Sequence, residues 1–227
     1  MALQRILEPE VMDSAKEAQE YNDMDHSAVN KVFVADLLAY AMSVDAEEEF
    51  ALGDVIDLGT GTALIPIELC KTHESCRVMA VDLAAHMLDL AKYNVQVAGL
   101  EDRVSLAQID AKEMPFDSHM FDVSMSNSII HHIADPLSSL KEMVRVTQED
   151  GIVFVRDLMR PETQEEIDQL VMTYTGEETE YSQKLFRDSL HASLSLDEIC
   201  EMVEELGYDS DSVTATTDRH WTWATIR

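Results

Sequence analysis

The residues best suited to chemistry form one run early in the chain, Val55-Ile56-Asp57-Leu58-Gly59-Thr60-Gly61. Apolar residues lead into an acid and a Gly-x-Gly turn, which is typical of a strand, a tight loop and the start of a helix. Glycine lets the backbone turn sharply and lets a ligand approach closely. A carboxylate at Asp57 would repel a pyrophosphate but accept a hydrogen bond from an ammonium group. We therefore expect a ligand that is cationic at this end of the loop.

Positions further along the chain extend this site. A dinucleotide-binding fingerprint requires another glycine three residues after Gly61, and that position is Leu64. Asp82 ends the predicted strand 77–82, where its two oxygens can accept both hydroxyls of a ribose. Asp110 follows the next predicted strand and can accept from the exocyclic amine of an adenine, with Ala111 supplying a backbone contact. The pattern thus favours a nucleoside ligand without a pyrophosphate.

Two consecutive histidines, His131 and His132, follow the predicted strand 121–126. Either could act as a general base, because an unperturbed imidazole titrates near neutral pH. We expect one of them to face a pocket and the other to pack away, and lining or structural roles remain open for both. No metal site is predicted, because adjacent side chains diverge and no third ligand has a suitable spacing.

Residues that could contact a substrate lie at both ends of the chain. Arg156, Arg160 and Arg187 could together hold a carboxylate or phosphate, or they could be neutralised by nearby acids. Tyr21 and His26 could line a lid over the ligand, or they could be ordinary surface or capping residues.

Helices and strands alternate along the chain in a pattern that predicts an α/β fold. Helical periodicity covers 28–43, and 9–24 is a polar helix. A turn is predicted at 150–151 before a strand at 152–155. The 162–191 segment reads as an inserted pair of helices, 165–174 and 179–191. A capped helix beginning near Ser195 and a closing hairpin, 211–216 with 220–226, complete the chain.

Composition limits the classes of partner. The chain has 227 residues, with 45 acidic and 16 basic residues and a formal net charge of −29. Such a field repels phosphate backbones and anionic membranes, so nucleic acid and membrane partners are not expected. Three cysteines, without paired spacing, argue against a disulfide framework. No apolar run reaches transmembrane length and no signal peptide is evident, so we expect a cytoplasmic, acidic protein. The oligomeric state cannot be predicted.

Taken together, the glycine run, Asp82, Asp110 and the strand Phe121-Asp122-Val123 resemble the class I S-adenosylmethionine-dependent methyltransferases. The segment Asn127-Ser128-Ile129-Ile130-His131-His132-Ile133-Ala134-Asp135-Pro136 is similar to that of the quinone and small-molecule C-methyltransferase branch. The resemblance covers residues 28–157 well and the remainder loosely. Ala63 departs from the family, in which many members have a third glycine.

The resemblance implies a fold, a cofactor and residue roles. The fold would be a Rossmann-like, doubly wound sheet of seven strands, mostly parallel with the last antiparallel, with helices on both faces. Residues 1–227 would form one domain, with an N-terminal helical segment at 1–45 and the 162–191 insertion over the substrate side. The cofactor would be S-adenosyl-L-methionine, and the residues implied to contact it are Asp57, Gly59, Thr60, Gly61, Asp82, Leu83, Asp110, Ala111 and Asn127.

Three functions are consistent with this pattern. The first is methyl transfer to a small-molecule acceptor, which the arginines suggest is anionic. The second is modification of S-adenosylmethionine itself, because Tyr181-Ser182-Gln183-Lys184 and Arg187 faintly resemble enzymes that carboxylate this cofactor. The third is a non-catalytic protein that only binds the cofactor, since fold alone does not define function.

Overall fold

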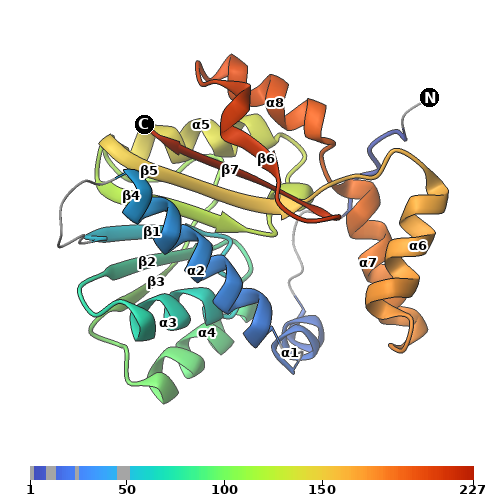
Figure 1. Cartoon of the computed structure of the whole chain (residues 1–227). Coiled ribbons are helices and arrows are strands. Elements are labelled where there is room, and N and C mark those ends of the chain that lie inside the picture. The colour runs from blue at the N-terminus through green and yellow to red at the C-terminus, as the bar shows by residue number, and fades with distance from the viewer. Residues whose placement is uncertain (1–2, 9–13, 24–25, 45–51) are drawn as a thin grey trace. The chain divides into compact units, whose positions relative to one another are not determined.

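The computed structural model describes residues 3–8, 14–23, 26–44 and 52–227, and their strands form one seven-stranded sheet (Figure 1). The strands are β1 (Asp54–Leu58), β2 (Arg77–Asp82), β3 (Val104–Gln108), β4 (Phe121–Asn127), β5 (Thr147–Leu158), β6 (Val213–Ala215) and β7 (His220–Ile226). Their order across the sheet is β3-β2-β1-β4-β5-β7-β6. The pairs β1–β2, β1–β4 and β2–β3 are parallel and β6–β7 is antiparallel, which confirms the predicted fold class.

The helices of the described residues agree closely with the sequence pattern. They are α1 (Ala15–Asp23), α2 (Ser27–Val44), α3 (Leu64–Thr72), α4 (Ala85–Ala98), α5 (Pro136–Val146), α6 (Gln164–Thr175), α7 (Glu180–Ala192) and α8 (Leu196–Glu205), with short 3₁₀ turns η1 (Ile130–His132) and η2 (Ser210–Ser212). Both helices of the predicted insertion are present as α6 and α7. The cap at Ser195 is a capping box completed by Glu198, which satisfies backbone N–H groups that the first turn of α8 leaves unpaired.

The chain folds as two compact units. The larger unit contains the described residues from 14 to 127, together with Ser138–Val155 and Ala224–Arg227. The smaller unit contains residues 3–8, Ser128–Leu137 and Arg156–Trp223. The predicted cofactor residues all belong to the larger unit, whereas the histidine pair and the three arginines belong to the smaller one.

Within the larger unit, α2 packs against α3, and α4 lies beside α3 (Figure 1). By length and composition alone α2 could cross a membrane, contrary to the expectation that no apolar run is long enough. Its Phe33, Val34 and Leu37 are nevertheless buried in the main core, together with Val55 and Val78 of the sheet. This burial is typical of a helix that packs its apolar face on the core of a globular unit.

The smaller unit has its own apolar cluster. Ile167, Leu170 and Val171 of α6 pack with Leu190 of α7 and with Leu158 at the end of β5. Trp221 and Trp223 on β7 are fully buried. The α6–α7 pair is therefore a packed hairpin of helices with a core of its own.

Two local expectations need correction. Asp150 and Gly151, predicted as a turn, lie inside the continuous strand β5, where Asp150 adopts a left-handed backbone with φ 65°. A single residue with a left-handed backbone can bend a strand locally without ending it. Cys70 and Cys200 both fall on apolar faces of predicted helices, which predicts core positions for both; Cys70 is buried, whereas Cys200 is only partly buried.

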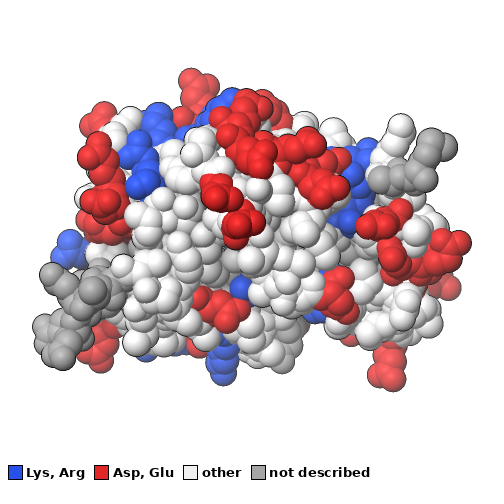
Figure 2. Space-filling view, turned by 45° about the horizontal axis from the view of Figure 1, so that its top comes forward, with Lys and Arg blue, Asp and Glu red and all other residues white. Residues whose placement is uncertain are grey.

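The surface reflects the acidic composition. Figure 2 shows one face of the molecule, on which Asp and Glu side chains are spread widely and Lys and Arg side chains are fewer. The exposed acids of the α8 region, which include Asp197, Glu201, Glu204 and Glu205, contribute to this field. Such a surface disfavours association with polyanions.

Candidate functional site

The predicted cofactor residues come together at one edge of the sheet in the larger unit. Leu58 at the end of β1 is level with Val81 of β2 and with Ser126 of β4, and Asp82 is level with Gln108 of β3. The carboxyl ends of four neighbouring parallel strands therefore meet there. Open α/β sheets bind their ligands at this kind of edge.

The glycine loop after β1 is held in a tight conformation. Gly59 and Gly61 have φ values of 69° and 55°, which L-residues with a side chain adopt rarely. The N–H of Gly59 donates to the Val81 carbonyl at 2.8 Å. Asp82 accepts from the Gly61 N–H through Oδ2 and from the Ala84 N–H through Oδ1, both at 2.8 Å. Sequence reasoning assigned Asp82 only to a ribose and missed that its carboxylate also fixes the loop.

Asp57 is the most unusual residue of this edge. Its side chain is 2% exposed, and Oδ2 is buried without a hydrogen-bond partner. Burial and the nearby charge of Asp82 together raise the pKa of Asp57 to about 7, against a smaller lowering by the Thr60 hydroxyl. A buried carboxylate without a partner is unfavourable. The arrangement would therefore gain from a bound cation, as the sequence predicted.

Another group of residues lies at the ends of β2 and β3. Leu83 exposes 36% of its surface, and its carbonyl accepts from the side-chain amide of Gln108 at 2.9 Å. Asp110 accepts from the backbone N–H of Lys112 at 2.9 Å. Burial opposes ionisation of Asp110, but this N–H and the Lys112 ammonium outweigh it and hold the pKa of Asp110 below its ordinary value. An apolar surface beside a hydrogen-bond acceptor suits a purine base, with Ala111 largely buried behind them.

Helix α1 covers part of the glycine loop. The amide of Asn94 donates to Asn22 of α1 at 2.8 Å and to the Thr62 carbonyl at 3.0 Å. A Cβ added at Gly61 would lie 3.6 Å from Cε1 of Tyr21. The ring of Tyr21 stacks on His26 with centroids 4.5 Å apart. Tyr21 thus lies against the loop. His26 stacks on Tyr21, and among the described residues no contact between His26 and the loop is seen.

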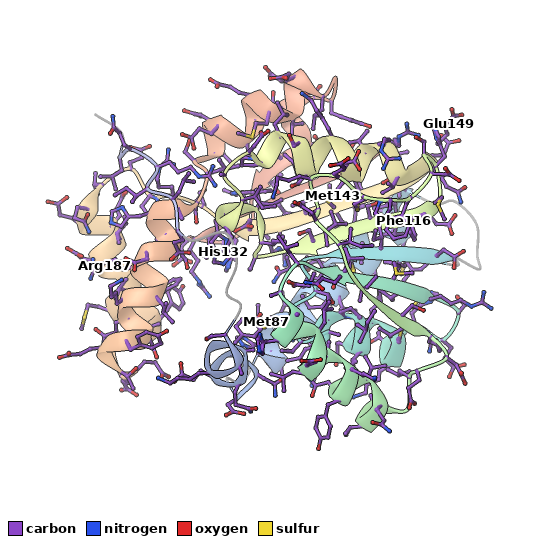
Figure 3. All side chains as sticks on the ribbon, turned by 180° about the vertical axis from the view of Figure 1, so that it is seen from behind. Met87, Phe116, His132, Met143, Glu149 and Arg187 are labelled. Atoms are coloured by element: carbon purple, nitrogen blue, oxygen red, sulfur yellow. The ribbon has the colours of Figure 1, made fainter. Side chains whose placement is uncertain are left out.

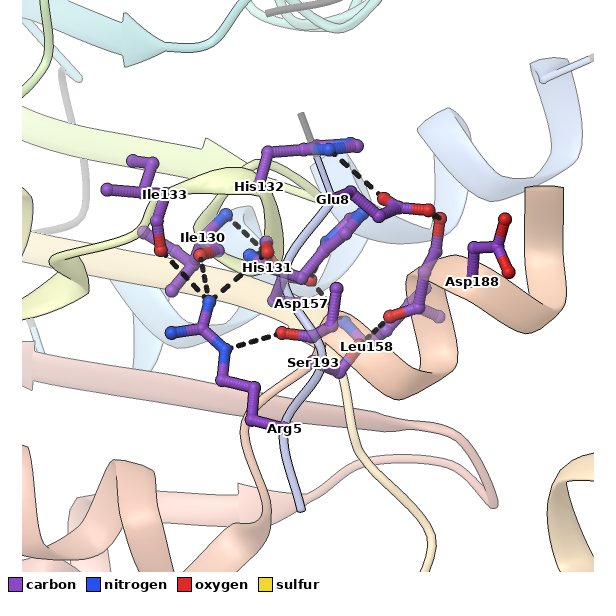
Figure 4. Close-up of polar contacts among 12 residues, drawn as sticks. Arg5, Glu8, Ile130, His131, His132, Ile133, Asp157, Leu158, Asp188 and Ser193 are labelled. Carbon is purple, nitrogen blue, oxygen red and sulfur yellow. Dashed lines mark hydrogen bonds and ion pairs between the residues drawn. The ribbon is translucent and has the colours of Figure 1, made fainter. Parts of the chain in front are cut away.

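In the smaller unit, Asp157 holds the first histidine of the pair (Figure 4). His131 is 4% exposed, and its Nδ1 lies 2.5 Å from Asp157 Oδ1. Asp157 also accepts from the backbone N–H groups of Ile130 and Leu158 at 2.5 and 2.6 Å. Burial lowers the pKa of His131, but the Asp157 carboxylate outweighs it and leaves this pKa above its ordinary value. Sequence reasoning gave Asp157 no role beyond that of an acid close to the arginines, although it lies next to the end of the strand that follows the pair.

The second histidine faces an acid from the start of the chain. Glu8 Oε2 lies 3.3 Å from His132 Nδ1, and the rings of His131 and His132 are 4.1 Å apart at an angle of 39°. The reasoning that the two side chains diverge was therefore wrong. Burial and the neighbouring His131 lower the pKa of His132 to about 3, so its imidazole is neutral near pH 7. Arg5 anchors this segment by donating to the carbonyls of Ala192, His131 and Ile133 at 2.6, 3.1 and 2.9 Å.

The three arginines predicted to form a clamp each contact a different partner. Arg156 is buried and donates to the Thr222 hydroxyl at 2.9 Å. Arg160 pairs with Glu198 at 2.6 Å. Arg187, on the α6–α7 hairpin and away from His132 in Figure 3, pairs with Asp168. A joint clamp stays a prediction, and it would require Arg160 and Arg187 to leave these acids.

Known proteins match the part of the chain that carries this edge of the sheet. Residues 56–155 match the family model described as a methyltransferase domain. The demethylmenaquinone methyltransferase of Porphyromonas gingivalis is 31% identical over 115 residues, which are 50% of this chain and 47% of that protein. The chain thus spans about half the length of the curated relatives it matches.

Solved structures resemble the fold over more of the chain. A crystal structure described as an S-adenosyl-L-methionine-dependent methyltransferase from Methanococcus maripaludis has a TM-score of 0.71 at 16% identity, covering 98% of this chain and 97% of that one. The plantazolicin methyltransferase BpumL, in complex with a pentazolic desmethylPZN analog and SAH, has a TM-score of 0.68 at 13% identity and covers 88% and 72%. At these identities the likeness shows a shared fold.

Proposed function

We propose that this protein, whose residues 56–155 match a family model described as a methyltransferase domain, transfers the methyl group of S-adenosylmethionine to a small molecule. The observation that carries the proposal is the buried Oδ2 of Asp57, which has no partner beside the glycine loop. The amino group of the cofactor's methionine part is a cation of the right chemistry for it.

The remaining residues of the edge fit the other parts of the cofactor. Gly59 and Gly61 leave room for close approach at the loop, and Asp82 offers its carboxylate to the ribose hydroxyls. Leu83 and Asp110 suit the face and the amine of the adenine, and Asn127 ends β4 at the same edge. Thr60 adds a buried hydroxyl beside the Asp57 carboxyl group.

When bound, S-adenosylmethionine supplies a methyl group already activated by its sulfonium. The chain's own task is to hold the cofactor and the acceptor in line and to exclude water. Proton removal is needed only for some acceptors. The assignment of His131 and His132 as a general base stays a prediction.

A small acceptor is supported by the acidic surface, which repels nucleic acid, and by small-molecule relatives such as the demethylmenaquinone methyltransferase. An anionic acceptor has weaker support, because its predicted arginines are paired with other groups. We place the reaction in the cytoplasm on composition alone. The comparisons favour methyl transfer over carboxylation of the cofactor or binding without turnover.

The direct test is mass spectrometry of small molecules released when the freshly purified protein is denatured, followed by a screen of acceptors with a labelled methyl group. We expect S-adenosylmethionine or its demethylated product, and transfer of label to at least one small molecule. A protein that arrives empty and fails to bind added cofactor would refute the proposal. A carboxylated cofactor would replace it with the second function.

Tyr21 provides a test of the lid. We expect Tyr21→Ala to weaken cofactor binding by about tenfold, because the ring edge that lies against the glycine loop is lost. Tyr21→Phe should bind normally, since the contact is made by the ring and not by the hydroxyl. Isothermal titration calorimetry measures both, with Tyr93→Ala as a matched control at an exposed position of α4. Equal losses in the alanine variants of Tyr21 and Tyr93 would count against a lid.

A further inference from the structure

Glu8, His131 and His132 form a compact group that methyl transfer does not require. Each offers one ligand atom, and these atoms all lie within 4.8 Å of one another. We propose that the three residues bind a divalent transition-metal ion of the Zn²⁺ class through two imidazole nitrogens and one carboxylate oxygen. The proposal does not depend on the proposed methyl transfer, because it concerns residues of the smaller unit alone.

His131 is already oriented as a ligand. Its Nδ1 lies 2.5 Å from the Asp157 carboxylate, which can only accept, so Nδ1 carries a proton and Nε2 is the nitrogen that a metal ion would bind, with loss of any proton it carries. Histidines that bind metals commonly donate their other ring N–H to a carboxylate in this way, because the contact fixes both the tautomer and the orientation of the ring. Three further backbone N–H groups hold Asp157 itself, those of Ile130, His131 and Leu158.

His132 provides an independent observation. Its Nδ1 is buried and makes no hydrogen bond, although Glu8 Oε2 is only 3.3 Å away. A buried nitrogen without a partner is uncommon in a folded protein and calls for an unassigned partner. An ion between this nitrogen and the Glu8 oxygen would satisfy both, and 3.3 Å is close to the ligand–ligand separation that metal bonds of about 2.0–2.1 Å produce in a tetrahedral site.

Glu8 is held in place by contacts on both sides. Arg5 ties the segment to four carbonyls, and the N–H of Ile6 donates to the His191 carbonyl at 3.0 Å. The Ser189 hydroxyl donates to the Glu8 carboxylate at 3.3 Å. Carboxylates that bind metals are commonly hydrogen-bonded from a second side in this manner. The segment therefore presents Glu8 to the histidines as a positioned group (Figure 4).

The donor set indicates the class of ion. Two imidazoles and one carboxylate suit Zn²⁺, Fe²⁺ or Co²⁺ better than Ca²⁺ or Mg²⁺, which prefer sites made of oxygen ligands alone. Three protein ligands leave at least one coordination position for water or for an oxygen of a small molecule, as in catalytic rather than structural zinc sites.

The test uses Co²⁺ as a spectroscopic probe on the untagged full chain after removal of metals by a chelator. We expect one Co²⁺ per chain, with the visible absorption bands of a four- or five-coordinate ion, and displacement of that ion by Zn²⁺. Glu8→Gln and His132→Gln should each weaken Co²⁺ binding by at least about tenfold and reduce the bands. Asp157→Asn should weaken it by about 10–100-fold through the orientation of His131.

Glu8 and His132 are partly exposed, so both variants should fold, and thermal melts without metal would verify this. His86→Gln, an exposed histidine of α4, is the matched control and should bind Co²⁺ as the unaltered chain does. Co²⁺ bound only as the pale six-coordinate aquo-type ion would overturn the proposal. So would binding that Glu8→Gln and His132→Gln leave unchanged.

Discussion

Replacing Asp57 with asparagine is expected to make the ligand-free protein more stable at pH 8, by up to about 4 kcal/mol, while most of its affinity for S-adenosylmethionine is lost. The side chain is buried, Oδ2 has no hydrogen-bond partner, and burial raises its pKa from 3.8 to about 7. Ionising this group in the folded state therefore costs free energy. Asparagine keeps the shape and cannot ionise.

The stability difference should depend on pH in a defined direction. Because the pKa of Asp57 is higher in the folded than in the unfolded chain, its neutral form adds stability below about pH 4, and this is lost as the pH rises through about 7. Calorimetric unfolding at pH 5 and pH 8 without ligand measures the effect. Asp89→Asn, at an exposed position of α4, controls for the general relief of a net charge of −29. Equal stabilisation by both substitutions would contradict the argument.

Cofactor binding should change in the opposite sense. Removing a charged partner from a buried hydrogen bond costs roughly 3 kcal/mol, so Asp57→Asn should weaken S-adenosylmethionine binding about 100-fold in titration calorimetry. The unaltered protein should itself bind about tenfold more weakly at pH 6 than at pH 8, because the free carboxyl group is then mostly neutral. A variant that binds as tightly as the parent would show that Asp57 does not meet the amino group.

Features encoded by neighbouring residues were predictable from the sequence. The glycine loop, the capping box of Ser195 with Glu198 and the two helices of the insertion all depend on short stretches whose backbone preferences are strong. Asp57 and Asp82 could be assigned to one edge of the sheet because each lies at or next to the end of a strand, and parallel strands bring such ends together. Their contact with the cofactor stays a prediction.

Features that depend on distant segments were not predictable. Nothing in the local pattern around Glu8 indicates that it would lie 3.3 Å from His132, because that contact depends on how the first residues cross the smaller unit. Arg160 could not be matched to Glu198 in advance for the same reason. The contact of Asp157 with His131 could have been predicted. A carboxylate near the end of the strand that follows a histidine pair can reach that pair, and sequence reasoning missed this.

Asp157→Ala is expected to reduce the free energy of unfolding by about 4 kcal/mol, the second large effect. The carboxylate is 1% exposed and accepts from the N–H groups of Ile130, His131 and Leu158 and from the His131 ring. Alanine would leave these donors buried without an acceptor. Burial opposes ionisation of Asp157, but the adjacent His131 outweighs it and holds the pKa below its ordinary value, so the charged form is the one that is lost.

Asp157→Asn separates the two parts of this effect. The amide oxygen can still accept from the backbone N–H groups of Ile130 and His131, but its NH₂ group would face the Leu158 N–H and Nδ1 of His131, so about half of the loss is expected. Urea unfolding at pH 7 should show a lower midpoint with an unchanged m-value for both variants, and Asp102→Ala, at an exposed position, should change little. Because the same carboxylate orients His131, Asp157→Asn should lose Co²⁺ affinity while remaining folded, and that combination distinguishes a positioning role from a purely structural one.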